Sequence, residues 1–157
     1  MKRVLLLALT AAAVLPFVAR AQSKPDFSGT WTLDASKSDA PMGRGGLGGA
    51  AVAGPMTIMQ TAAEITIVRG PQTLKYKLDG SESTNQMMGR GGAQDVKSKA
   101  RWDGARLVVE TTRDFGGMSI TTKETRSLSA DGKEMTIENA ISTPQGDMNS
   151  KQVFTKS

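Results

Sequence analysis

The chain has 157 residues, no cysteine, no histidine and a formal net charge of +5. The missing residue types exclude disulfides, thiol chemistry, a Ser-His-Asp triad and a histidine general base. Seven aromatic residues, none of them grouped with basic residues, argue against a nucleic-acid partner.

The first 21 residues have the pattern of a cleaved export signal. Lys2 and Arg3 precede an apolar stretch over 4–18, and a small-x-small cleavage site follows at 19–21. Because the apolar stretch is shorter than the roughly 20 residues that span a membrane, we expect cleavage and no membrane span. Cleavage removes three basic residues and lowers the net charge from +5 to +2. With no cysteine to carry a lipid anchor, residues 22–157 are expected to be periplasmic or secreted.

Residues 22–157 number 136, which suits a single domain. Short runs that alternate apolar and polar residues are separated by polar turns, and three of these turns contain Asp-Gly. The expected strands are 27–33, 56–61, 64–69, 73–78, 95–102, 106–113, 118–128, 134–141 and 149–155. Two glycine-rich segments, 42–54 and 81–93, are expected to be flexible loops, and each contains the sequence Met-Gly-Arg-Gly-Gly.

Consecutive hairpins of this kind, with no helical apolar period, predict an all-β protein. A meander of eight to nine antiparallel strands avoids free edges most simply by closing into an up-and-down β-barrel. The alternative fold is a two-sheet β-sandwich.

The first expected strand begins with Gly29-Thr30-Trp31, which resembles the Gly-x-Trp signature of the lipocalin (calycin) superfamily. Three longer stretches, 26–34, 102–111 and 128–137, are similar to a largely uncharacterised family of exported bacterial lipocalin-like proteins. The resemblance implies a lipocalin-like barrel in which Trp31, next to Gly29 on one face, closes one end. It also implies an arginine from a late strand lying over the indole, and Arg126 is the candidate for that role.

Alternation along 118–128 places Glu124 and Arg126 on one face, together with Ile120 and Leu128. The apolar ends of this set make its face the inward one, so the two charges form an interior acid–base pair. This pair is interpreted either as a polar anchor for a ligand or as a buried salt bridge that supports the barrel floor.

Other candidate sites are poorly supported by the sequence. The Met-Gly-Arg-Gly-Gly segments could offer backbone N–H groups to an anion, but they lack the lysine and the helix of a P-loop, and mobile loops at the barrel mouth are the alternative. The methionines have no histidine or cysteine beside them to complete a copper site. Most aspartates lie in turns, where they act as turn formers. We therefore expect no catalytic residue, no metal and no cofactor.

These patterns favour a non-enzymatic barrel that binds a small hydrophobic or amphiphilic ligand. The expected ligand-binding residues are Tyr76, Trp102, Glu124 and Arg126, and the expected barrel-closing residues are Gly29, Trp31 and Arg126. The full expected lining is Trp31, Ile67, Leu74, Tyr76, Val96, Trp102, Val109, Ile120, Arg126, Ile137 and Phe154. The alternative function is a solid-cored interaction or structural module of the cell envelope that uses 42–54 and 81–93. The sequence leaves the oligomeric state open.

Overall fold

The structure, a computed structural model, describes residues 24–39, 54–89, 92–115, 117–143 and 146–157. The strands are β1 (Gly29–Leu33), β2 (Met56–Gln60), β3 (Glu64–Arg69), β4 (Gln72–Lys77), β5 (Glu82–Gly89), β6 (Gly92–Asp103), β7 (Arg106–Phe115), β8 (Met118–Leu128), β9 (Glu134–Thr143) and β10 (Gly146–Lys156). In these ranges there is no helix long and apolar enough to cross a membrane. The expected export signal at 1–21 lies outside the described residues, as does the glycine-rich segment 42–54 except for Gly54.

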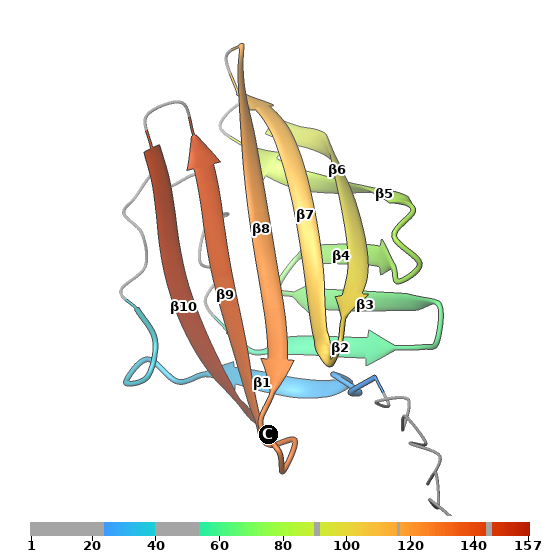
Figure 1. Cartoon of the computed structure of the whole chain (residues 1–157), viewed down its shortest axis with the longest axis vertical. Helices are drawn as coiled ribbons and strands as arrows, with labels where there is room; N and C mark the ends of the chain where they lie inside the picture. The colour runs from blue at the N-terminus through green and yellow to red at the C-terminus, as the bar shows by residue number, and fades with distance from the viewer. Residues whose placement is uncertain (1–23, 40–53, 90–91, 116, 144–145) are drawn as a thin grey trace, which may run out of the picture.

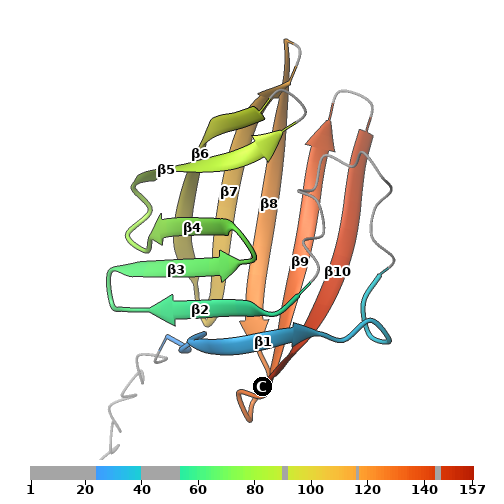
Figure 2. The ribbon, with the colours of Figure 1, turned by 180° about the vertical axis from the view of Figure 1, so that it is seen from behind.

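All ten strands belong to one antiparallel sheet with the order β4-β3-β2-β1-β10-β9-β8-β7-β6-β5. Consecutive strands pair with one another except β4 and β5, and β1 pairs with β10, which joins the first strand to the last. The sheet curves until its two edges, β4 and β5, lie side by side (Figures 1 and 2). The all-β barrel is therefore confirmed, the two-sheet sandwich is wrong, and the strand count is ten rather than eight to nine.

The extra strand is β5, which lies where a flexible segment over 81–93 was expected. It pairs with β6 from Glu82↔Lys99 to Gly89↔Gly92, so Met88, Gly89 and Gly92 of the second Met-Gly-Arg-Gly-Gly sequence belong to these strands, and its residues 90–91 lie outside the described residues. The alternation is present, but the buried members are Ser83 and Asn85 instead of apolar residues. A search for apolar alternation misses such a strand because its inner face is polar.

The two edges are joined by side chains rather than by a backbone ladder. Asn85 accepts a hydrogen bond from the Lys75 backbone N–H at 2.7 Å and donates one to the Lys75 carbonyl at 2.9 Å. Ser83 accepts a hydrogen bond from the Lys77 N–H at 2.9 Å. The carboxamide thus replaces one residue of a missing strand, since it offers both a donor and an acceptor. We call this junction the β4–β5 seam.

One end of the barrel is filled by an apolar floor. Trp31, Phe27 and Phe154 are fully buried there and belong to one hydrophobic cluster. The indole N–H of Trp31 donates to the Phe27 carbonyl at 2.9 Å, which satisfies its polar atom inside the core. Gln60 holds the entering chain in place because its side chain accepts from the Phe27 N–H and donates to the Pro25 carbonyl.

The Gly-x-Trp motif has a steric explanation. In the register of β1 and β10, Trp31 lies opposite Lys156, whose ammonium is 5.3 Å from the centre of the indole ring. A Cβ on Gly29 would come within 2.5 Å of the Lys156 side chain, and Gly29 has a φ of 134°, which favours glycine. The structure corrects the expected partner: in the described chain, Lys156 rather than Arg126 lies over Trp31.

Replacing Trp31 with alanine should lower the free energy of unfolding by about 3–5 kcal/mol, because it empties the centre of the floor. Thermal or urea unfolding measures the change. Thr32→Ala is the matched control, since Thr32 is the exposed neighbour on the same strand and should have little effect. Equal stability of the two variants would contradict this placement of Trp31.

Replacing Asn85 with alanine should destabilise the barrel by about 1–3 kcal/mol, because two hydrogen bonds across the seam are lost. Hydrogen exchange should also become faster at the Lys75 amide, which loses its acceptor. Gln86→Ala, which changes an exposed residue of the same strand, should leave both readouts unchanged. Unaltered exchange at Lys75 in Asn85→Ala would show that the seam does not depend on this side chain.

Candidate ligand-binding site

Above the floor, the inner face of the barrel changes from apolar to mixed polarity. On β8, the side of the strand that includes buried Ile120 and Arg126 also presents Thr122 and Glu124, which remain half-buried. On the neighbouring strand β9, Asn139 lies opposite Glu124 and adds a further polar residue to this part of the barrel. Thr122 and Glu124 therefore face inward and keep part of their surface exposed.

The residues predicted to line the interior all face inward. Nine of its members are buried: Trp31, Ile67, Tyr76, Val96, Val109, Ile120, Arg126, Ile137 and Phe154. Leu74 and Trp102 are partly buried against the same core. The faces of most of these strands could be read from the sequence because apolar and polar residues alternate along them.

Glu124 and Arg126 form the predicted interior ion pair, in which the Arg126 Nε donates to Glu124. The Arg126 side chain is 5% exposed, whereas that of Glu124 is 27% exposed. The carboxylate therefore faces the accessible part of the interior while the guanidinium is buried behind it. This pair does not satisfy Arg126 fully, because its Nη1 is buried without a hydrogen-bond partner.

Two further arginines face the same interior and were not singled out from the sequence. Arg69 follows Ile65 and Ile67 on the inner side of β3, and Arg113 follows Val109 and Thr111 on the inner side of β7. The Nε atom of each is buried without a hydrogen-bond partner. Alternation alone could have identified both, but each stands at the end of an expected strand, where a charged residue is usually solvated.

Electrostatic effects show that these side chains act on one another. Burial lowers the pKa of Arg69, the charge of Arg126 lowers it further, and Glu124 opposes both. Burial also lowers the pKa of Arg113, and Tyr76 acts in the opposite direction. Arg69 is thus influenced by Arg126 and Glu124, whereas Arg113 is influenced by Tyr76.

Tyr76 stands among these charges. Burial raises the pKa of its hydroxyl far above the usual range. Glu124 raises this pKa as well, while Arg126 and Arg113 lower it. Because desolvation is the largest effect, Tyr76 stays protonated and can donate a hydrogen bond to an anion. Three of the four predicted ligand-binding residues, Tyr76, Glu124 and Arg126, are thus brought together.

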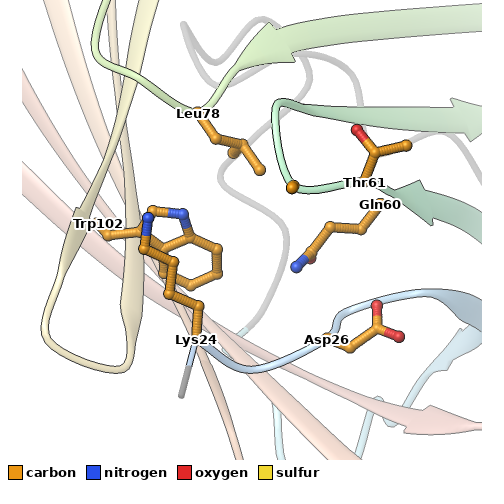
Figure 3. Close-up of a pocket in the computed structure, with 7 residues that line it drawn as sticks. Lys24, Asp26, Gln60, Thr61, Leu78 and Trp102 are labelled. Atoms are coloured by element: carbon orange, nitrogen blue, oxygen red, sulfur yellow. The ribbon is translucent and has the colours of Figure 1, made fainter. Parts of the chain in front are cut away.

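The fourth, Trp102, lies against the floor. Its ring stacks on Phe27 with 6.1 Å between centroids, and the Lys24 ammonium is 5.6 Å from the centre of its indole. It lines an open cleft of about 420 Å³ with Lys24, Asp26, Gln60, Thr61, Ala62 and Leu78 (Figure 3). The cleft lies at the end where the β2–β3 and β4–β5 turns meet the entering chain.

No group of three or more carboxylate, histidine or cysteine side chains in the described ranges could hold a metal ion. Several exposed aspartates there stabilise turns. Asp79 and Asp34, for example, each accept hydrogen bonds from the serine two residues later, which lowers the pKa of both.

No family model matches the chain, and no curated protein matches its sequence. Solved structures share its fold. Zebrafish ileal bile acid-binding protein, in complex with cholic acid, superposes with a TM-score of 0.54 and 17% identity, over 83% of this chain and 98% of that chain. A point mutant of the fluorescent protein UnaG superposes with a TM-score of 0.51 and 17% identity, over 83% of this chain and 96% of that chain. A secretory abundant heat soluble protein from Ramazzottius varieornatus superposes with a TM-score of 0.46 and 19% identity, over 66% of this chain and 70% of that chain. The first two likenesses confirm the antiparallel β-barrel fold.

Proposed function

We propose that this protein is an exported, non-enzymatic binding protein that holds a small, partly apolar molecule inside its barrel. The observation that carries this proposal is the change of the inner face above the floor, where Thr122 and Glu124 face inward and remain partly exposed. Such a combination of an apolar base and a few convergent polar groups is typical of small-molecule sites. The zebrafish barrel in complex with cholic acid supports a binding role for this shape.

The compartment and the family are part of the same proposal. The pattern at 1–21 supports export, and the stretches 26–34, 102–111 and 128–137 support membership of the exported bacterial lipocalin-like proteins. A binding role without catalysis agrees with a sequence that has no histidine and no cysteine. The alternative role as an envelope interaction module loses part of its expected surface, since 82–89 forms β5 rather than a free loop.

The protein should bind the neutral fluorophore N-phenylnaphthylamine in the barrel, which fluorescence titration detects as enhanced emission. Thr122→Trp should weaken this binding at least about tenfold, because its indole would occupy the interior beside Thr111. Thr121→Trp is the matched control, because Thr121 is exposed on the outer side of the same strand and should leave the affinity unchanged.

Absence of binding, or equal affinities for Thr122→Trp and Thr121→Trp in folded protein, would contradict a ligand site inside the barrel. Mass spectrometry of molecules that remain with protein purified from its native source tests the same site without a probe and identifies the natural ligand. If the interior is occupied, the same compound class should be depleted from Thr122→Trp and retained by Thr121→Trp.

A further inference from the structure

The open cleft that Trp102 lines lies outside the barrel interior, at the floor end, and we call it the floor cleft. Its volume of about 420 Å³ is within the range of small-molecule sites. Lys24 and Trp102 stand on one side of this cleft, and Gln60 and Thr61 stand across from them (Figure 3). The binding role proposed for the barrel interior leaves the floor cleft without a function.

Trp102 presents a well-anchored aromatic ring to the floor cleft. The ring of Phe27 stacks on it with an interplanar angle of 23°. Phe27 is fully buried, and hydrogen bonds from its N–H to Gln60 and from Trp31 to its carbonyl hold it in place. The indole of Trp102 is thus backed by the floor, and it is only half-buried, so part of its surface is open to the cleft.

A cation already lies over this ring. The Lys24 ammonium is 5.6 Å from the ring centre, within the distance at which the electron-rich face of an indole attracts a positive charge. Within the described ranges Lys24 has no ion pair and no hydrogen bond, so the contact with the ring alone holds its exposed side chain there. A single cation–π contact at an exposed site is weak. A cation from solution can therefore take the place of the Lys24 ammonium.

The charge on the opposite side of the exchange is Asp26, which lines the same cleft with an exposed carboxylate. Hydrogen bonding by Ser28 lowers the pKa of Asp26, with a smaller contribution from Lys156, so the carboxylate is ionised at neutral pH. Once Lys24 leaves the ring, Asp26 is the charged side chain that remains in the lining of the cleft. The emptied ring face and the carboxylate both attract a cation.

We propose that the floor cleft binds a small organic cation with a quaternary ammonium group, whose charge replaces the Lys24 ammonium over Trp102. A primary ammonium is strongly hydrated and loses that hydration at an aromatic ring, whereas a quaternary ammonium has no N–H group to satisfy. Leu78 and Ala62 offer apolar surface to its alkyl groups. This site is separate from the barrel interior, and its occupation does not depend on the ligand bound there.

Choline and dimethylbutanol, its neutral analogue with carbon in place of nitrogen, are matched probes of the same shape. The indole N–H signals of the two tryptophans report binding in heteronuclear NMR spectra of the whole protein. Choline should shift the Trp102 signal in a saturable way and the Trp31 signal much less, because Trp31 lies inside the floor. Choline should bind at least about tenfold more tightly than the alcohol, since only choline carries a charge.

Variants assign the shift to the floor cleft. Lys24→Gln should raise the affinity for choline about threefold or more, because it removes the competing ammonium. Asp26→Asn should lower this affinity several-fold. Lys123→Gln is the matched control, because it makes the same change in net charge at an exposed residue on the outer side of β8, and it should leave the affinity unchanged. Thr122→Trp, which alters the barrel interior, should also have no effect on choline binding.

No shift at Trp102, or equal affinities for choline and the alcohol, would overturn the proposal. An affinity for choline that is the same in Lys24→Gln as in the unaltered protein would show that the lysine does not compete, which would overturn it as well. Loss of choline binding in folded Thr122→Trp would place the cation inside the barrel instead. Binding to phosphatidylcholine vesicles without binding of free choline would overturn the assignment to a small ligand.

Discussion

Burial of Trp31 where β1 meets β10 is the interaction on which the barrel depends. The first and the last strand come together at this point, and the pairing of Trp31 with Lys156 fixes their register. The indole is fully buried, its N–H is satisfied by Phe27, and Gly29 leaves room for the lysine side chain that covers it. Packing at this junction closes one end of the barrel.

The far junction, the β4–β5 seam, closes by different chemistry. A backbone ladder would need the two edge strands to meet along their length, and here Ser83 and Asn85 supply the hydrogen bonds instead. The polar inner face of β5 is therefore structural. The barrel combines an apolar floor at β1 and β10 with a seam held by a few polar side chains. Local opening needs the least free energy where fewest bonds must break, so the seam is the weaker of the two junctions.

The sequence allowed most of the fold to be predicted, because alternation is a local signal. It gave the inner faces of β6, β7 and β8 correctly and placed Glu124 and Arg126 together. It missed β5 because Ser83 and Asn85 occupy positions where a search for strands expects apolar residues. It also named Arg126 as the partner of Trp31, where the structure has Lys156. That pairing depends on the register between the two ends of the chain, which no local pattern contains.

Arg69 and Arg113 illustrate the same limit for the candidate site. Each continues an inward alternation, but only the closed barrel brings β3, β7 and β8 round a common interior, where Arg69 feels the charge of Arg126 and Arg113 interacts with Tyr76. The Nε atoms of Arg69 and Arg113 are buried there without hydrogen-bond partners. Buried donors without acceptors lower the stability of the folded protein. The polar part of the inner face therefore costs stability that the packing of the apolar floor offsets.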